Sequence, residues 1–382
     1  MTKRPRILVW QPVLTDHLAY VLDALGNAAD ADLETVAITH NQAERVKQGW
    51  QPLGLEHLNP AILSRNKWIG QVVGLLRRRP DTVHLFCGPF GDLRITVALL
   101  AALALRRKVY VVSEPYSPSA TGYLEDGNRY IAGLKARLRP FIYRLFGIAL
   151  RRRMTGVFAI SPLASQQFRE MGVPETAIFP FGYFVPSPGI DPAQAEQDAN
   201  SATRLKLCFV GSLILRKGLH RLIQATRAVT GSAVSLDVYG AGDPSKYDID
   251  GDTVNYCGLI PFGTASTVMS GYDAVVVPSE HDGWGVVVNE ALSAGVPVVV
   301  SRNVGASAMV EKFGCGIVYD PEQPDALHKA LTRLASNPDE LPDLQVATKV
   351  LQPLLEPEVA GRYMADVMFG ATVPSCPWYD CP

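Results

Sequence analysis

The chain has 382 residues, of which 47% are hydrophobic and 19% are charged. Such a composition excludes an intrinsically disordered protein, and the length predicts two globular domains rather than one. The net charge of −1 hides an asymmetry: residues 1–190 contain 23 Lys and Arg against 14 Asp and Glu, whereas residues 191–382 contain 13 against 23. The basic first half is expected to face an anionic partner. No recognition motif accompanies this charge, so we expect no nucleic acid partner.

Targeting features and cysteine usage predict the compartment. No leader-like pattern precedes the first predicted strand, and the longest apolar run, 95–105, is too short to cross a bilayer. The six cysteines have no metal-ligand spacing and mostly occur in apolar runs, which is typical of a reducing compartment. We therefore expect a cytoplasmic protein, with peripheral attachment to the inner face of the plasma membrane as an extension of that expectation.

Apolar, β-branched runs alternate with helical stretches in two series. The first series predicts strands at 6–10, 35–39, 83–87, 109–113, 157–161 and 178–181, and the second at 206–210, 235–239, 254–257, 274–278, 296–301 and 316–319. Apolar strands separated by helices are typical of parallel sheets covered on both faces, so each series predicts a doubly wound α/β domain. Residues 186–204 are rich in Pro, Ala and polar side chains and are interpreted as a linker.

Several polar side chains of the first half follow or lie within predicted strands. Those that we expect on an acceptor-binding side are Thr15, His17, His84, Glu114 and Tyr116. Thr15 and the helix that follows it can donate hydrogen bonds, and Glu114 can accept one or act as a local acid or base. Alternatives remain open, because a strand histidine such as His84 is commonly structural, and Glu114 can equally cap a helix or pair with an arginine.

Residues 129–153 contain eight basic side chains and no acidic one. Leu134, Leu138 and Leu145 recur at helical spacing, whereas Pro140 is expected to split or kink the helix. A basic amphipathic helix of this kind binds anionic membrane surfaces, and we favour that interpretation for Arg129 to Arg153. The alternative is a helix that packs on the core and exposes a solvated basic face.

The second half opens with a strand that ends in glycine and is followed by two cations, Arg216 and Lys217, at the start of a helix. Backbone N–H groups, the helix dipole and cationic side chains together form a diphosphate site, although an exposed Arg-Lys pair can also be plain solvated surface. Gly240 and Gly242 begin a dinucleotide fingerprint that lacks its third glycine, so they argue only weakly for NAD.

Residues 274–300 are the most informative segment. An apolar strand ends at Pro278, a loop is expected to expose Glu280, His281 and Asp282, and Glu290 is expected near the start of the next helix. Ligands of open α/β sheets bind where such loops meet helix N-termini. Two carboxylates directed at one crevice can accept hydrogen bonds from vicinal hydroxyls, which indicates a ribose or a sugar.

Four of these pieces occur together in a fixed order: GSLILRKG at 211–218, YGAG at 239–242, CGLIP at 257–261 and DGWGVVVNEALSAGVPVV at 282–299. The combination resembles the retaining glycosyltransferases of family 4 (glycosyl transferases group 1) over about residues 205–335. The resemblance implies the α/β GT-B fold, in which two Rossmann-like doubly wound domains face each other across a cleft. It also implies that a last helix near 359–368 crosses back to the first domain.

The resemblance implies the following domain roles. Residues 1–185, completed by about 358–382, would bind the acceptor, and residues 205–357 would bind the sugar nucleotide. Arg216 and Lys217 would hold the donor diphosphate and Glu290 the ribose hydroxyls. The family's first glutamate is replaced here by Asp282, so either Asp282 or Glu280 takes that role. The other positions expected at the donor are Gly211, Ser212, Gly218, Gly240, Gly242, Ile260, Gly283, Trp284 and Gly285.

The chain departs from the family at two further places: Ser212 stands where an arginine is frequent, with Arg216 as its replacement, and the region of Thr15 lacks the usual Gly-Gly pair. The implied reaction is retaining transfer of a hexosyl unit from a nucleoside-diphosphate sugar to a glycan or lipid-linked acceptor in surface polysaccharide or glycolipid assembly. The alternatives are a sugar-nucleotide-binding or scaffold protein with a degenerate site, and a GT-B epimerase or phosphorylase. The acidic run 248–252 is interpreted as a solvated turn, and we expect no metal and no cofactor besides the donor.

Overall fold

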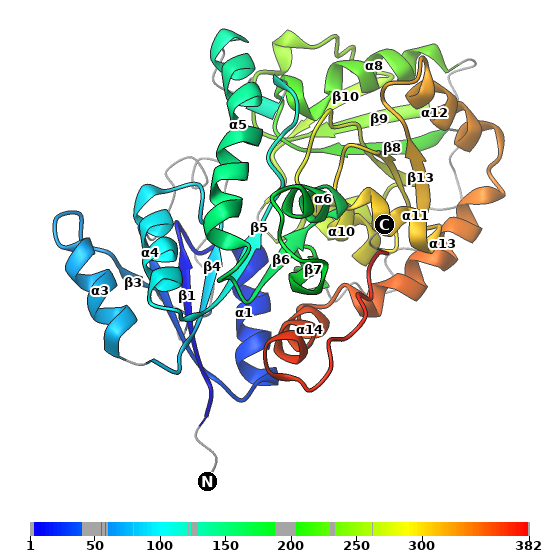
Figure 1. Cartoon of the computed structure of the whole chain (residues 1–382). Coiled ribbons are helices and arrows are strands. Elements are labelled where there is room, and N and C mark those ends of the chain that lie inside the picture. Colours follow the sequence, from blue (N-terminus) through cyan, green and yellow to red (C-terminus); the bar gives the residue numbers. More distant parts are fainter. Residues whose placement is uncertain are drawn as a thin grey trace. The chain divides into compact units, whose positions relative to one another are not determined.

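The computed structural model describes residues 4–39, 55, 58, 60–78, 80–120, 122–123, 129–187, 204–229, 234–261 and 263–380. The chain divides into two compact units (Figure 1). The first unit comprises Met1–Tyr116, Arg137–Val185 and Pro357–Pro382, and the second comprises Ser117–Ala136 and Pro186–Glu356. Residues 117–136 therefore group with the second unit, although the sequence placed them in the first domain. Most of the expected linker, 188–203, lies outside the described residues.

The first unit is built on a seven-stranded sheet in the order β3-β2-β1-β4-β5-β6-β7. All of its strand pairs are parallel. The strands are β1 Arg6–Gln11, β2 Asp32–Ala37, β3 Ala61–Ile62, β4 Val83–Cys87, β5 Lys108–Ser113, β6 Gly156–Ile160 and β7 Ile178–Phe181. The helices are α1 Asp16–Ala28, α3 Trp68–Arg78, α4 Leu93–Ala104, α6 Pro162–Glu170, the 3-10 turn η3 Glu175–Ala177, α14 Pro357–Phe369 and, from Arg137 onward, α5 Arg129–Leu150, whose first residues group with the second unit.

Successive side chains of a strand point to opposite faces of the sheet, so each face packs against its own set of helices. Leu8 and Trp10 of β1 lie in one apolar cluster together with buried residues of α3, α4, α5 and α6. Helix α14, the last helix of the chain, packs against α1 (Figure 1). A Cβ atom at Gly361 would lie only 2.5 Å from the Cβ of Ala24, so the absent side chain permits this close approach. The expectation that the final helix returns to the first domain is confirmed.

The last described residues also belong to the first unit. Trp378 and Tyr379 are fully buried, and the Tyr379 Oη accepts a 2.8 Å hydrogen bond from the backbone N–H of Phe181. The indole of Trp378 packs 4.3 Å from the ring of Phe184. The tail thus ties β6 and the edge strand β7 to α14 through an aromatic cluster, which the sequence pattern did not indicate.

The second unit contains a six-stranded sheet in the order β10-β9-β8-β11-β12-β13, again with parallel pairs throughout. Its strands are β8 Leu205–Val210, β9 Val234–Tyr239, β10 Val254–Gly258, β11 Ala274–Val277, β12 Val298–Ser301 and β13 Gly316–Tyr319. Its helical segments are η4 Leu215–Lys217, α8 Leu219–Ala228, η6 Pro244–Lys246, α9 Ala265–Met269, α10 Val286–Ser293, α11 Ser307–Phe313, α12 Ala326–Ser336, α13 Glu340–Leu351 and η7 Gln352–Leu354. Each unit is therefore a Rossmann-like α/β domain, as expected.

Two local expectations are corrected. Helix α5 runs unbroken from Arg129 to Leu150 with Pro140 inside it, so of the expected split or kink, the split does not occur. A proline removes one N–H donor from a helix, and the remaining hydrogen bonds on either side of Pro140 are enough to keep the segment helical. Strand β3 was not expected, because its two residues pair with β2 over too short a length to leave a pattern in the sequence.

Candidate functional site

The candidate donor site lies at the carboxyl end of the second unit's sheet, where the loops after β8 and β9 touch. The N–H of Leu213 donates to the carbonyl of Ala241 over 2.7 Å. Gly240 has a φ of +146°, and a Cβ atom there would lie 1.8 Å from the carbonyl oxygen of Gly211. Only glycine permits this contact, so the two glycine-containing loops predicted from the sequence form a single continuous surface.

A second glycine attaches the cationic turn to strand β11. Gly218 has a φ of +73° and caps η4, the 3-10 turn that carries Arg216 and Lys217. A Cβ atom at Gly218 would lie 2.1 Å from the carbonyl oxygen of Pro278, directly after β11. The expected diphosphate cations are thereby held next to the loop that contains the expected carboxylates.

One backbone and one side-chain hydrogen bond connect these two segments in opposite directions. The N–H of Glu280 donates to the carbonyl of Arg216 over 2.9 Å, and the Arg216 Nη1 donates to the carbonyl of His281 over the same distance. Arg216 therefore positions the loop as well as supplying charge. His281 is buried, which corrects the expectation that the loop exposes it, because this loop lies on the cationic turn instead of projecting into solvent.

Asp282 and Lys217 form the central ion pair of the site. The Lys217 Nζ donates to the Asp282 Oδ2 over 2.6 Å, and the two side chains are 21% and 14% exposed. Burial opposes ionisation of Asp282, but the charge and hydrogen bond of Lys217, with Arg216 adding to them, outweigh it and hold the pKa of this carboxyl below its usual range. Asp282 is therefore a carboxylate at neutral pH.

Glu280 has a separate set of partners. Its Oε1 lies 3.0 Å from the Arg221 Nη2, and its backbone carbonyl accepts a 3.1 Å hydrogen bond from the Asn303 Nδ2. The imidazole of His220 lies 4.0 Å from the same carboxylate oxygen. Of the two carboxylates considered for the first role, Asp282 is the one paired with the predicted diphosphate lysine, whereas Glu280 is bound to the first turn of α8.

Helix α10 carries Glu290 as its fifth residue, one turn further along than the sequence suggested. Burial raises the pKa of the Glu290 carboxyl to about 7, and no cation in the described part of the chain is near enough to lower it. This carboxyl therefore changes protonation near neutral pH. A carboxyl with such a raised pKa, on the helix that follows β11, is a candidate binding or catalytic group.

The structure limits the role of two expected donor positions. The Trp284 side chain is fully buried, and its Nε1 donates to the Asn289 Oδ1 over 2.8 Å, so only the backbone can meet a ligand there. Gly283 and Gly285 lie on either side of it, and Gly285 caps α10 with a φ of +86°. Ile260 follows the end of β10 and remains partly exposed, and Ser212 is partly exposed beside Gly211.

The acidic run at 248–252 forms a turn, as expected. The Asp250 Oδ1 accepts hydrogen bonds from the backbone N–H groups of residues 252, 253 and 254, and Arg227 pairs with Asp248 and Asp250. These carboxylates thus have partners within the chain. Across the described residues, no group of three or more His, Cys, Asp and Glu side chains is arranged to hold a metal ion.

The candidate residues of the first unit do not converge in the same way. Thr15 caps α1 through its carbonyl, and the ring of His17 packs 5.8 Å from that of Tyr183. Glu114 lies exposed just after β5, where it was expected. Tyr116 instead packs edge-on against Tyr143, with 4.6 Å between ring centroids, as part of the apolar cluster.

His84 lies in the core of the first unit. Its Nδ1 accepts a 3.1 Å hydrogen bond from the Trp10 Nε1, and burial, with the charge of Arg107 adding to it, lowers its pKa to about 4. The imidazole is thus neutral at physiological pH. This placement favours the structural alternative for His84.

Two residues with functional potential were missed. Arg221 pairs with Glu280 from the first turn of α8, and its position four residues after Lys217 was a usable signal. Gln11, the last residue of β1, is buried, and neither atom of its amide has a hydrogen-bond partner among the described residues. Its place directly after an apolar strand could have indicated it.

With this geometry in view, the comparisons with known proteins are informative. A family model described as glycosyl transferases group 1 matches residues 191–349, and a model described as a glycosyl transferase 4-like domain matches residues 19–183. Together the two models span both units.

The chain belongs to the group 1 glycosyltransferases.

Other members of the group are recognisably similar. WcaL of Escherichia coli K12, named as a glycosyltransferase of colanic acid biosynthesis, is 25% identical over 341 residues, which is 84% of this chain and 78% of WcaL. An uncharacterized glycosyltransferase of Methanocaldococcus jannaschii is 30% identical over 139 residues, so that match spans 34% of this chain and 36% of the relative.

Solved structures show the fold of this glycosyltransferase. The crystal structure of Anabaena HepE in complex with UDP and glucose matches with a TM-score of 0.68 and 13% identity, over 97% of this chain and 100% of that one. At that identity the likeness shows architecture alone. The fold is GT-B, as the sequence resemblance implied.

Proposed function

We propose that this chain transfers a hexosyl unit from a nucleoside-diphosphate sugar to an acceptor hydroxyl, with retention of anomeric configuration, in the assembly of a surface polysaccharide or glycolipid. The observation that carries the proposal is the placement of Arg216 and Lys217 against the carboxylate loop, next to the paired glycine loops. The complex of HepE with UDP and glucose and the colanic acid role in WcaL's name support the same reaction class.

The cationic turn provides the chemistry that the leaving group requires. Transfer leaves negative charge on the diphosphate, and fixed cations in a partly dry site stabilise this charge more than water does. An ammonium group has three donors, so Lys217 can keep its 2.6 Å contact with Asp282 and still donate to a phosphate oxygen. Helix α8 begins directly after this turn, and the N-terminus of a helix favours a nearby anion.

In this proposal the cations of the chain take the part that a metal ion plays in other transferases. Arg216 and Lys217 supply two charges beside Gly218, and no step needs a divalent ion. We therefore propose metal-independent transfer, with the sugar nucleotide as the sole small-molecule donor. Retained activity after exhaustive chelation is the expected result.

Glu290 is proposed as the ribose contact and Asp282 as the contact to the donor sugar. An ionised carboxylate accepts hydrogen bonds from two vicinal hydroxyls, and Glu290 reaches that form as the pH passes its pKa of about 7. Asp282 is held ionised by Lys217, so its carboxylate can accept a hydrogen bond from a hydroxyl of the donor sugar. In the first unit, Thr15, His17, Glu114 and Gln11 are the proposed contacts of a glycan or lipid-linked acceptor.

The direct test is a product assay. Purified chain is incubated with UDP-, GDP- and ADP-hexoses and with lipid-linked oligosaccharide acceptors, and nucleoside diphosphate release and the anomeric signals of the product are followed by NMR. Lys217→Met is expected to abolish transfer, whereas Lys312→Met, an exposed lysine of the same unit, is the matched control.

Each rival function has its own outcome in this assay. Turnover that requires inorganic phosphate would indicate a phosphorylase, and release of an epimerised free sugar would indicate an epimerase. Donor binding without any turnover would indicate a sugar-nucleotide-binding protein. An inverted anomeric product would contradict the retaining step alone.

A further inference from the structure

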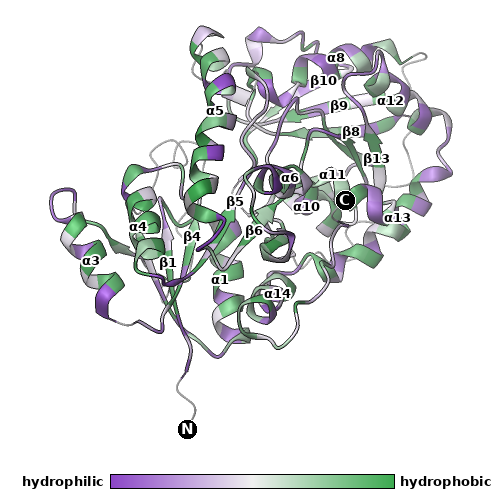
Figure 2. Cartoon of the chain, in the orientation of Figure 1, coloured by the Kyte–Doolittle hydropathy of each residue, from purple (hydrophilic) through white to green (hydrophobic). Residues whose placement is uncertain are grey.

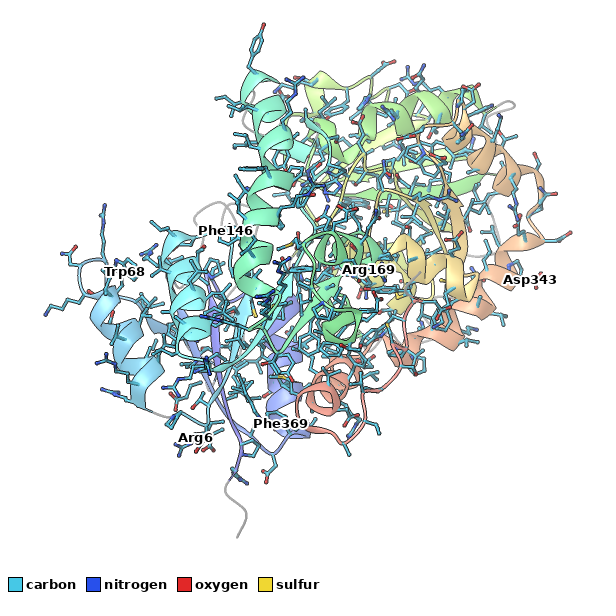
Figure 3. All side chains as sticks on the ribbon, viewed as in Figure 1. Arg6, Trp68, Phe146, Arg169, Asp343 and Phe369 are labelled. Carbon is cyan, nitrogen blue, oxygen red and sulfur yellow. The ribbon has the colours of Figure 1, made fainter. Side chains whose placement is uncertain are left out.

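Helix α5 uses one of its faces to pack on the first unit. Tyr143 and Leu150 are buried in the apolar cluster of that unit. Phe146, labelled in Figure 3, packs against Phe90 just before α4, with 4.9 Å between ring centroids. These contacts fix which side of α5 faces the core.

The opposite face of α5 is apolar and exposed. Leu138, Phe141, Leu145 and Ile148 are spaced three or four residues apart, and Phe141 and Ile148 are each 62% exposed. At about 100° per residue these side chains form one stripe on the side of the helix away from Tyr143 and Leu150. Leu134 extends it toward the helix N-terminus. The helix therefore has a separate face for the core, which corrects the alternative in which these leucines pack inward.

Arginines border this stripe. Arg137, Arg144 and Arg151 are seven residues apart and exposed, so they line one edge of the stripe for its whole length. Within the described residues, none of the three is paired with an acidic side chain. Figure 2 shows α5 as a mostly hydrophobic helix with isolated hydrophilic bands. Apolar residues and cations thus face solvent together.

The neighbouring helices α3 and α4 also expose apolar side chains. Leu93 on α4 and Ile69 on α3 are exposed, and both helices cover the same face of the sheet as α5. Basic residues follow here too: Arg77 and Arg78 lie in the last turn of α3, and residues 106–108 directly after α4 are Arg, Arg and Lys.

We propose that this surface, centred on Leu138, Phe141, Leu145 and Ile148 of α5 and bordered by its arginines, docks on a lipid bilayer with anionic headgroups. Helices of this type lie in the plane of the interface, with apolar side chains below the headgroups and cations among them. Among the described helices, none combines the length and apolar character needed to traverse a bilayer.

The positive charge of this surface favours an anionic bilayer as its partner over a second copy of the chain. A two-fold contact would place the same surface against itself, and the arginines of both copies would meet. An anionic bilayer instead complements them. The benefit of docking rests on the proposed function, because docking would bring the acceptor site to lipid-linked substrates at the membrane. The binding itself is independent of donor chemistry.

The test is flotation of the full chain with vesicles of phosphatidylglycerol and phosphatidylcholine, compared with pure phosphatidylcholine. The wild type is expected to float with the anionic vesicles at low salt and to be released at high salt. Each cation near the surface contributes about a fivefold gain in partitioning, so Arg137→Gln, Arg144→Gln and Arg151→Gln combined should lower it about a hundredfold. Combined Phe141→Ser, Leu145→Ser and Ile148→Ser should lower it at least tenfold, as an order-of-magnitude estimate.

Matched controls come from the second unit. Val346 and Val350 on α13 are as exposed as the stripe, so Val346→Ser with Val350→Ser should leave flotation unchanged. Combined Lys246→Gln, Lys312→Gln and Lys329→Gln is the charge control. Thermal unfolding checks that each variant is folded, and the shift produced by nucleotide should persist in all of them.

Three results would overturn the inference. They are equal binding to neutral and anionic vesicles, flotation that survives the α5 substitutions, and a wild type that is dimeric in light scattering while the stripe variant is monomeric. Loss of flotation with intact nucleotide binding supports docking alone, whereas nucleotide binding that fails while flotation persists refutes only the proposed function.

Discussion

Replacing Lys217 with methionine tests the charge balance of the site. The Nζ lies 2.6 Å from the Asp282 Oδ2, and both side chains are mostly buried. At an effective dielectric of about 20, the gross attraction over that distance is about 6 kcal/mol. Desolvation and the ordering of two side chains offset most of it, so we expect a net loss of about 2 kcal/mol in the variant, because Asp282 is left as a buried carboxylate with a weaker partner.

The sign of the pH dependence distinguishes this cause from simple loss of packing. In the wild type the pKa of Asp282 is lowered, so its contribution is present above the unfolded value of 3.8 and is lost as the pH falls through the folded value. Without Lys217, burial dominates and that pKa rises. The loss in free energy of unfolding caused by Lys217→Met should then become smaller as the pH is lowered from about 8 to about 5.

Calorimetric unfolding of the full chain measures this effect. For a unit of this size, about 2 kcal/mol corresponds to a Tm that is lower by about 4–8 °C at neutral pH. Asp282→Asn in the Lys217→Met background should restore part of the loss, and Lys312→Met should show none. A deficit that is independent of pH, or one that Asp282→Asn deepens, would refute the reasoning.

Three further outcomes are expected. Because Glu290 has a raised pKa of about 7 against 4.5 unfolded, wild-type stability should fall as the pH rises between those values, and Glu290→Gln, measured by urea unfolding, should be more stable by about 2–3 kcal/mol at alkaline pH. His84 has a lowered pKa of about 4 against 6.5, so the first unit should lose stability as the pH falls between these values, and His84→Phe should flatten that slope in the same titration. Gly240→Ala should lower the Tm of the second unit strongly through its contact with Gly211, whereas Gly74→Ala in the open middle of α3 should raise stability by about 0.5–1 kcal/mol.

The strands were predictable because buried parallel strands carry long β-branched runs. All of the predicted strands are present, and the residues proposed to bind the donor follow strands of the second unit. The pairing of Lys217 with Asp282 was not predictable, because the two residues meet only through the approach of Gly218 to Pro278, which is a property of the folded loops. The burial of Trp284 depends in the same way on its bond to Asn289.

The candidate site of the first unit was harder to predict. An isolated His84 gives the same sequence signal whether it faces the core or a ligand, and only its bond to Trp10 distinguishes the two. The α5 stripe was visible as a periodicity, but a periodic apolar face does not reveal whether protein or lipid covers it. The buried Tyr143 and Leu150 show that the core of the first unit lies on the other side of α5, so this core does not cover the stripe.

The most direct test of the central claim is the thermal stability of the chain with UDP, GDP, ADP and NAD, each in large excess. A nucleotide at about 100 times its Kd stabilises the chain by about 2.7 kcal/mol, a shift that is easily measured. The account predicts that one nucleoside diphosphate raises the Tm, that Lys217→Met and Glu290→Ala abolish the shift, and that Lys312→Met retains it. If no nucleotide shifts the Tm, or if the shift persists in Lys217→Met, the assignment of this loop cluster as the donor site is contradicted.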